Sequence, residues 1–295
     1  MAYTIPQVDS VHFSDFVTAM PDLSGKTFVV TGTTTGTGRI AAQTLASKGG
    51  RVIMLNRPSA RAKEVQETLA ETFSEALVLS VDCDLQSFAS VRAAAERLHS
   101  LCAESGIDVL INNAGIMAMP DEATEDGFDT QMQTNHLSHF LLTRALFSLL
   151  EQAADARGEA RIVNHSSVAR KSARRLEAKY LEARGGQLGG NGASMMFGGA
   201  RWTRYSQTKL ANAAFTAALH ERLRAQDSKV KALVAHPGWA NTQLQLRANQ
   251  EGGLASWSSW LARMVSQSEE DGTLGILSCA VLPDAQCGQF YGPGS

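Results

Sequence analysis

Tyr205 and Lys209 are the pair of residues in this sequence whose types and spacing best suit proton transfer. They are four positions apart in a stretch with helical patterning, so their side chains share one face of the expected helix. A free tyrosine has a pKa of about 10 and is a poor base at neutral pH, but a neighbouring ammonium group favours the phenolate. The pair therefore predicts a general acid or base, although Y-x-x-x-K alone is often incidental.

A glycine-rich segment lies directly after the first expected strand. Residues 31–38 read T-G-T-T-T-G-T-G and lead into an expected helix. Glycines let the backbone turn tightly and approach a pyrophosphate, and the positive end of the helix stabilises the anion. The strand before it and the helix after it are the context that such a motif requires. The residues expected to contact a bound dinucleotide here are Gly32, Thr34, Thr35, Gly36, Thr37 and Gly38.

The elements that must position these groups alternate along the chain. The expected strands are 27–31, 51–55, 76–81, 109–111, 161–164, 231–235 and 289–291, and the expected helices are 39–47, 59–72, 87–104, 137–150 and 205–224. This alternation implies right-handed β-α-β connections and a parallel sheet covered on both faces. The fold class is therefore α/β, a single doubly wound Rossmann-type domain with a parallel sheet of about seven strands. We expect it to span residues 25–295, after an N-terminal extension at 1–24.

The composition narrows the class of protein. Of 295 residues, 44% are hydrophobic and 19% are charged, and the formal net charge is -2. This balance argues against nucleic-acid binding, and no apolar run approaches the roughly 20 residues of a membrane-spanning helix. The four cysteines form no C-x-x-C pair, which is typical of reduced thiols, and no spaced histidine, cysteine and carboxylate cluster predicts a metal. A cytoplasmic protein without a membrane span is expected.

One segment, residues 168–204, breaks the alternation and forms a long insertion. It holds seven glycines and eight basic residues against two acidic ones. A loop of this length inside a compact domain is usually functional. We consider two interpretations. The segment is either a lid that favours a substrate with an apolar body and an anionic group, with Met195, Met196, Phe197 and Trp202 lining the apolar part of the site, or a solvated surface excursion.

Six further motifs follow the glycine-rich segment, and together the seven resemble the short-chain dehydrogenase/reductase family. The six are Asp84-Leu85, Asn112-Asn113-Ala114-Gly115, Gln133-Thr134-Asn135-His136-Leu137, Ser166-Ser167, Tyr205-Ser206-Gln207-Thr208-Lys209, and Pro237-Gly238 with Thr242. The resemblance covers roughly residues 25–293. The strings N-H-L-S-H-F, S-Q-T-K-L-A-N and H-P-G are most similar to retinol-dehydrogenase-like members.

The resemblance implies roles for individual residues. Tyr205 would be the general acid or base, Ser167 would hydrogen-bond the substrate oxygen, and Asn135 would position a water molecule that links Lys209 to solvent. Ser167 is preferred to Ser166 because the serine of the family is usually the second of the pair. The implied contacts to a nicotinamide cofactor beyond the glycine-rich segment are Asp84, Leu85, Asn113, Ala114, Gly115, Tyr205, Lys209, Pro237, Gly238, Ala240 and Thr242.

Two neighbouring residues leave alternatives open. Tyr180 lies 13 residues after Ser167, which is the spacing of simpler family members, but it is followed by Arg184 instead of lysine. Tyr205, by contrast, lies at the start of the expected apolar helix 205–224, so Tyr205 is preferred as the catalytic tyrosine. His165 stands where the family commonly has a small apolar residue, and it is either a core histidine or a neighbour of the active site.

The end of the second expected strand bears on the choice of cofactor. NAD sites place an acidic residue near this point, whereas a nearby arginine suits the 2'-phosphate of NADP. Here Asn56 is uncharged, and Arg57 can form a charge-assisted pair with a phosphate. NADP is therefore the predicted cofactor. The alternative is that Arg57 is a solvated loop cation and that NAD is tolerated.

The resulting prediction is an NADP-dependent oxidoreductase that transfers a hydride between nicotinamide and a carbonyl or alcohol group of a small apolar substrate. The alternatives are a C=C reductase of the same fold and a catalytically silent NADP-sensing or scaffold protein. The family commonly forms dimers through the helices expected at 137–150 and 205–224. Either a homodimer forms in this way or the insertion blocks that surface, and the sequence leaves both open.

Overall fold

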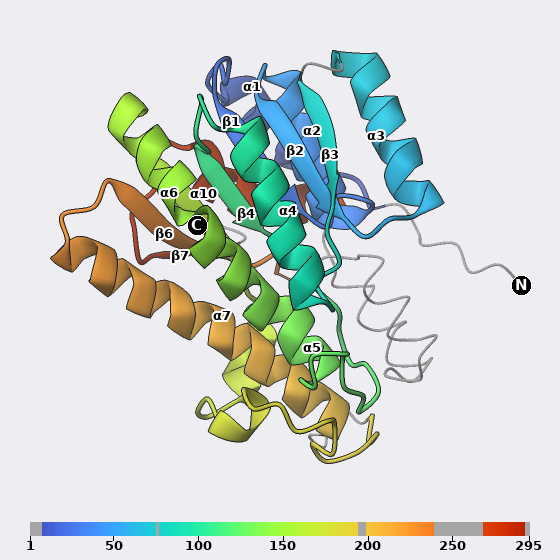
Figure 1. Cartoon of the computed structure of the whole chain (residues 1–295). Coiled ribbons are helices and arrows are strands. Elements are labelled where there is room, and N and C mark those ends of the chain that lie inside the picture. The colour runs from blue at the N-terminus through green and yellow to red at the C-terminus, as the bar shows by residue number, and fades with distance from the viewer. Residues whose placement is uncertain (1–7, 75–76, 194–198, 239–267, 293–295) are drawn as a thin grey trace, which may run out of the picture.

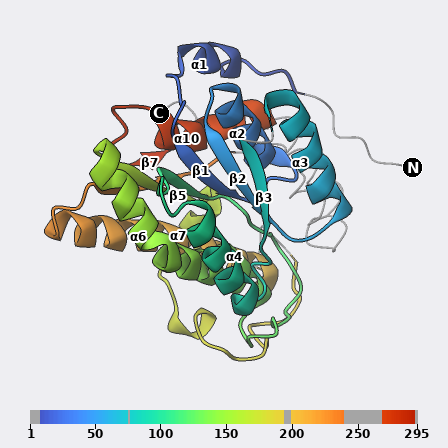
Figure 2. The ribbon, with the colours of Figure 1, turned by 45° about the horizontal axis from the view of Figure 1, so that its top comes forward.

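The computed structural model describes residues 8–74, 77–193, 199–238 and 268–292. Seven strands form one sheet in the order β3-β2-β1-β4-β5-β6-β7, and each neighbouring pair is parallel. Helices lie on both faces of the sheet (Figures 1 and 2). The strand order reverses between β1 and β4, which is where doubly wound sheets bind ligands. The predicted α/β fold class is confirmed.

The strands begin and end within one or two residues of the predicted positions where the structure describes them. They are β1 (Thr27–Thr31), β2 (Arg51–Asn56), β3 (Val78–Asp82), β4 (Val109–Asn112), β5 (Ala160–His165), β6 (Val230–Ala235) and β7 (Phe290–Tyr291). The helices are α1 (Phe13–Ala19), α2 (Gly36–Ser47), α3 (Ala60–Phe73), α4 (Phe88–Leu101), α5 (Thr130–Met132), α6 (Ser138–Arg157), α7 (Ala200–Ala225) and α10 (Glu269–Val281). The sequence did not predict α1, α5 and α10, and α7 begins five residues before Tyr205, inside the expected insertion.

Two apolar layers hold the helices against the sheet. On one face, α2, α3 and α10 pack on strand residues that include Phe28 and Val30. On the other face, α4, α6 and α7 pack on Val29 and Leu110. Successive strand residues point to opposite faces, and both faces are covered, so the strands read as continuous apolar runs in the sequence. None of the helices in the described ranges is long and apolar enough to cross a membrane.

Asp271 attaches the N-terminal segment to the domain. Its carboxylate accepts hydrogen bonds from the backbone amides of Val11, His12 and Phe13 at 2.8–3.0 Å, and from the hydroxyl of Ser10 at 3.0 Å. Burial opposes the charge, but these hydrogen bonds together hold the pKa of Asp271 below its ordinary value. The Asp271 carboxylate therefore joins the segment before β1 to α10, in addition to the packing of Phe13, Phe16 and Val17 against the same apolar core.

Replacing Asp271 by alanine is expected to weaken this attachment by about 1–3 kcal/mol, because several amides lose their acceptor. Amide hydrogen exchange at residues 11–13 should accelerate while exchange in β1 stays slow. The depressed pKa means that the contribution is present above a pH of about 4 and is lost as the pH falls below it. Asp15→Asn, an exposed change on α1, is the control. Unchanged exchange at residues 11–13 in Asp271→Ala would contradict this role.

Candidate active site

The predicted catalytic side chains come from three elements near the carboxyl edge of the sheet. Ser167 follows β5 by two residues, Asn135 lies in a π-helical turn (Gln133–Leu137) before α6, and Tyr205 and Lys209 lie near the start of α7. The structure brings all four together, as the following contacts establish.

Tyr205 is buried, and the side chain of Ser167 lies close enough to influence the pKa of its phenol. Burial raises the pKa of Tyr205 to about 12, and the Ser167 side chain lowers it only in part. The phenol therefore carries its proton at neutral pH. The hydroxyl of the neighbouring Ser166 points elsewhere and donates to the backbone oxygen of Lys209 at 2.7 Å. Of the two serines, Ser167 is the one whose side chain lies beside Tyr205.

Lys209 lies one helical turn beyond Tyr205, with its Nζ 5.7 Å from the centre of the tyrosine ring. Its ammonium group is buried and donates to the backbone oxygen of His165 at 3.1 Å. Burial lowers the pKa of Lys209 to about 8. A side chain on Gly115 would crowd this group, since a Cβ there would lie 3.4 Å from Nζ and 3.2 Å from Oδ1 of Asn135.

Asn135 is fully buried and ties the segment after β4 to α7. Its Oδ1 accepts from the amide of Ile116 at 2.7 Å, and its Nδ2 donates to the Ile116 oxygen at 2.9 Å and to the Thr208 hydroxyl at 3.0 Å. Its backbone oxygen accepts from Asn212 Nδ2 and from His139 Nδ1. The π-helical turn therefore places Asn135 between the two elements that flank Lys209.

Tyr180 lies in a different cluster from Tyr205. It packs with Met132, Leu188 and Ala211, whereas Tyr205 packs with Ala118 and Trp202. Because Lys209 and Ser167 lie beside Tyr205, the geometry supports Tyr205 as the tyrosine of the site.

The glycine-rich segment is packed too tightly for side chains at two of its glycines. A Cβ on Gly38 would lie 2.2 Å from the Gly32 oxygen, and one on Gly32 would lie 2.8 Å from the Cβ of Ala114. Gly32 and Gly36 also have positive φ angles of 72° and 59°, a region that glycine adopts readily. The segment lies at the carboxyl end of β1 and begins α2, so the first amides of this helix are available to an anion. These features fit a dinucleotide pyrophosphate.

Asn113 links this segment to Lys209 through His165. Its Nδ2 donates to the backbone oxygens of Thr31 and Gly32, and its Oδ1 accepts from Thr37 Oγ1 at 2.9 Å and from His165 Nδ1 at 3.1 Å. Since an amide oxygen only accepts, the Nδ1 of His165 carries the proton. Burial is the main cause that lowers the pKa of His165 to about 3, so the ring is neutral. His165 is both a core residue and a neighbour of the active site.

The remaining expected cofactor residues lie at the same edge of the sheet. Asp84 and Leu85 follow β3, and the Leu85 oxygen accepts from the Ser138 hydroxyl at 2.6 Å. Ala114 donates its amide to Thr31 Oγ1. Pro237 and Gly238 follow β6, whereas Ala240 and Thr242 lie outside the described residues.

A buried arginine, which could not be recognised from the sequence, holds the expected insertion at 168–204 in place. Arg204 on α7 is fully buried and donates to the backbone oxygens of Leu188, Gly190 and Met119. Its charge faces the carboxylates of Asp129 at 3.2 Å and Asp121 at 3.6 Å. Burial raises the pKa of Asp129 to about 6 even so. An arginine near the start of a helix gives no pattern that distinguishes it from a solvated cation.

The charges of the insertion are therefore not all free to attract a substrate. Besides Arg204, Lys179 pairs with Glu177 and Arg184 pairs with Glu182. Arg170 lies 3.8 Å over the ring of Phe290. Of the residues expected to line an apolar site, Trp202 packs against Tyr205, and Met195, Met196 and Phe197 lie outside the described residues.

Removing Arg204 should release the segment around Gly190. Arg204→Met leaves two buried carboxylates without their cation, which is expected to cost about 3–5 kcal/mol of unfolding free energy. Limited proteolysis near residues 185–191 should accelerate. Arg184→Met is the matched control, because its pair with Glu182 is half exposed and should contribute less than about 1 kcal/mol. Equal urea midpoints for the two variants would contradict the pinning role.

The architecture and the grouped side chains define a nucleotide-binding α/β oxidoreductase. The family model "short chain dehydrogenase" matches residues 26–187, more than half of the chain. Human retinol dehydrogenase 11 is 33% identical over 94% of this chain and 79% of its own length. An uncharacterized oxidoreductase of Schizosaccharomyces pombe is 34% identical over 76% of this chain and 63% of its own length.

Solved structures agree with this likeness. An uncharacterized protein from Mycobacterium paratuberculosis has a TM-score of 0.69 and 33% identity, covering 94% of this chain and 84% of its own. The chain belongs to the short-chain dehydrogenase/reductase family. The predicted resemblance, including its retinol-dehydrogenase-like character, is confirmed.

Proposed function

We propose that this family member is an NADP(H)-dependent carbonyl reductase or alcohol dehydrogenase for a small apolar substrate. The observation that carries the proposal is the buried Tyr205 phenol, which has the Ser167 side chain beside it and the Lys209 ammonium group 5.7 Å from its ring centre. Two hydroxyl groups that lie side by side can both donate to one substrate oxygen. This favours a carbonyl or alcohol over a C=C bond as the reacting group, and the intact group of four residues argues against a silent scaffold.

The cofactor would lie along the carboxyl edge of the sheet. The glycine-rich segment and the start of α2 would hold its pyrophosphate, and Asp84, Leu85, Asn113, Ala114 and Gly115 would line its adenosine and ribose portions. A bound nicotinamide ring supplies or accepts the hydride. The side chains of this chain then have two tasks, which are to fix the substrate oxygen and to move a proton.

Tyr205 would supply that proton in the direction of reduction. Its pKa of about 12 keeps the phenol protonated before reaction, and Ser167 would hold the carbonyl oxygen beside it. As the proton leaves, the ammonium group of Lys209 would stabilise the phenolate. Asn135 fixes the segment after β4 against α7 and would hold the water molecule through which Tyr205 regains a proton.

The surroundings of Tyr205 favour an apolar substrate. Trp202 lies edge-on to the tyrosine ring at 6.0 Å, and Ala118, Met117 and Ala169 complete this cluster. A substrate oxygen at Tyr205 would therefore have an aromatic and aliphatic wall beside it. The kinship with retinol dehydrogenase 11 supports the same substrate character.

The proposed homodimer and the cytoplasmic location remain predictions. Phe140 on α6 is 45% exposed and stacks edge-on with Phe215 of α7 at 5.3 Å. These two helices are the ones through which a dimer would form, and the exposed Phe140 ring is suited to burial between subunits.

The direct test compares two tyrosines with a panel of apolar aldehydes and ketones and NADPH. Tyr205→Phe removes the proton donor and is expected to lower kcat by about 10²–10⁴-fold, with the Kd for NADPH nearly unchanged. Tyr180→Phe is the matched control and should keep the activity of the parent protein. Full activity in Tyr205→Phe, or loss of activity in Tyr180→Phe alone, would overturn the assignment.

The pH dependence follows from Lys209. Because burial lowers the pKa of its ammonium group to about 8, the positive charge is present below that pH and is lost above it. The kcat/KM for carbonyl reduction should therefore fall as the pH rises through about 8. In Lys209→Arg any remaining activity should not fall there, since guanidinium stays charged. A profile for the parent protein that is flat up to a pH of about 10 would contradict this role.

A further inference from the structure

Ala118, in the segment between β4 and α5, has an unusual backbone conformation beside the candidate active site. Its φ angle is 53°, which lies in the left-handed region that residues other than glycine rarely adopt. The residue is fully buried and packs in one cluster with Tyr205 and Trp202. Such strain persists only where the surrounding structure enforces it, and it is concentrated at functional sites. The contacts that enforce it here therefore bear on Tyr205.

The backbone is held on both sides of Ala118. Before it, the side chain of Asn135 accepts from the amide of Ile116 at 2.7 Å and donates to the backbone oxygen of the same residue at 2.9 Å. After it, Arg204 donates through Nη2 to the backbone oxygen of Met119 at 3.0 Å. The chain on either side of the strained residue is therefore tied to the π-helical turn and to α7.

Arg201, three residues before Arg204 on α7, strengthens this attachment. Its Nη1 lies 3.4 Å from the backbone oxygen of Ala118, and its own backbone oxygen accepts from Nε2 of Gln131 at 3.2 Å. Residues three positions apart lie on one face of a helix, whereas Tyr205 follows Arg204 directly and points about 100° further round the axis. The start of α7 therefore presents the proposed proton donor and the groups that hold Ala118 from adjacent faces.

The burial of Arg204 is not explained by stability alone. Its guanidinium group is fully buried, with Nε 3.2 Å from Asp129 Oδ2 and Nη1 3.6 Å from Asp121 Oδ2. Among the described residues, neither this Nε nor Asp129 Oδ2 makes a hydrogen bond of good geometry. Replacing a buried ion pair by apolar side chains is often neutral or stabilising. The well-formed contacts of Arg204 are those to backbone oxygens, which indicates that its task is to control the backbone conformation.

We propose that Arg204 is a positioning residue for the candidate reaction, which holds the backbone around Ala118 so that this residue packs against Tyr205 and fixes the orientation of the phenol. The inference rests on the proposed function, since it takes Tyr205 as the proton donor. Both Arg204 and Ala118 are fully buried, so they act through Tyr205 and not by contact with the substrate. A misplacement of about 1 Å at a reacting group can lower a rate by about 100-fold, so the hold on this ring is measurable in kcat.

Ala118→Gly tests the packing without threatening the fold. It removes the methyl group from the Tyr205 cluster, and glycine adopts a positive φ readily, so relief of strain offsets the lost packing. The kcat for the apolar aldehyde that the parent protein reduces fastest should fall by about 10–100-fold. The KM for that aldehyde and the Kd for NADPH should stay within about twofold of the parent values, because ground-state binding is unchanged.

Arg204→Lys separates the charge of this residue from its reach. Lysine keeps a cation for Asp121 and Asp129, but its ammonium group lacks the planar fork that contacts Met119 and the insertion at the same time. The variant should therefore unfold at a urea concentration between those of the parent protein and Arg204→Met. Its kcat should fall as in Ala118→Gly, because the backbone around Ala118 is no longer held.

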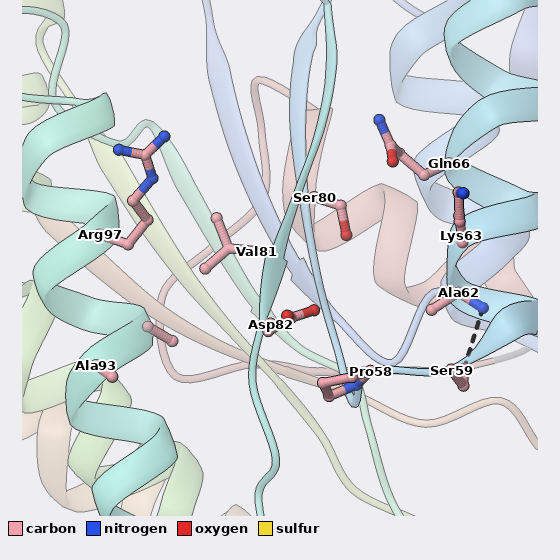
Figure 3. A pocket seen from close by; sticks show the side chains of 11 residues that line it. Pro58, Ser59, Ala62, Lys63, Gln66, Ser80, Val81, Asp82, Ala93 and Arg97 are labelled. Atoms are coloured by element: carbon pink, nitrogen blue, oxygen red, sulfur yellow. Dashed lines mark hydrogen bonds between the residues drawn. The ribbon is translucent and has the colours of Figure 1, made fainter.

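Ala94→Gly is the matched control for the loss of a buried methyl group. Ala94 is buried on α4 and lines a hollow of about 630 Å³ beside the edge strand β3, between α3 and α4 (Figure 3). Glycine within a helix lowers stability, so the urea midpoint of this variant should fall. Its kcat should match that of the parent protein, because the change does not touch the elements that hold Tyr205.

A double-mutant cycle of kcat with Tyr205→Phe tests whether Ala118 acts through the tyrosine. A residue that only positions the phenol hydroxyl has nothing left to position once this group is removed. At raised enzyme concentration, Ala118→Gly should therefore change the residual kcat of Tyr205→Phe by less than about twofold. A further loss of about 10–100-fold in that background would show a general effect on the site and would overturn the inference.

The remaining outcomes separate the two proposals. If folded Ala118→Gly or Arg204→Lys keeps the kcat of the parent protein, or raises KM in place of lowering kcat, the inference is overturned and the proposed function stands. An equal loss of kcat in Ala94→Gly would overturn it as well, because the effect would then follow from stability. If the parent protein reduces no carbonyl compound with NADPH, or Tyr205→Phe is fully active, the proposed function itself fails and the inference fails with it.

Discussion

A buried ammonium group is the constraint on which the arrangement of this site depends. Lys209 is enclosed between the end of β5 and α7, and desolvation of its charge must be offset by hydrogen bonds. The backbone oxygen of His165 supplies one at 3.1 Å, and a Cβ on Gly115 would come within contact distance of the ammonium group, 3.4 Å from Nζ. The same carbonyl accepts from Asn212 at 3.0 Å. His165, the last residue of β5, therefore accepts from Lys209 through its backbone oxygen and donates to Asn113 through its ring.

The charge state of the neighbouring histidines follows from the same burial. Burial lowers the pKa of His165 to about 3, with a smaller contribution from the Lys209 charge. Burial also lowers the pKa of His139 to about 4; a backbone hydrogen bond to Asn135 opposes this change, and the Lys209 charge adds to it. Both rings are neutral at physiological pH and act as fixed hydrogen-bonding spacers. Thr31 Oγ1 contacts His139 Nε2 at 2.9 Å, so the ring joins the π-helical turn to β1. The positive charge near Tyr205 therefore comes from Lys209 and not from His139 or His165.

Much of this arrangement could be predicted from the sequence, because it depends on local patterns. β1 is buried throughout and its three central residues are apolar, so the strand and the glycine-rich segment after it could be predicted. The spacing of Tyr205 and Lys209 places them on one helix face. The π-helical turn at Gln133–Leu137 could not be predicted, because its residues would equally suit a regular α-helix. The role of Arg204 depends on carboxylates more than 70 positions away, which is a tertiary relation without a local pattern. α10 was missed because two of its residues are glycines.

The most direct test of the account is thermal unfolding of the full chain with NADP, NADPH, NAD and NADH in turn, because it needs no knowledge of the substrate. A ligand at about 100 times its Kd adds roughly 2.7 kcal/mol to the stability of the folded state. The account predicts a clear rise in Tm with NADP and NADPH and a smaller rise with NAD and NADH at equal concentration. No rise with any of the four nucleotides would contradict a cofactor site at the carboxyl edge of the sheet, and with it the proposed enzyme.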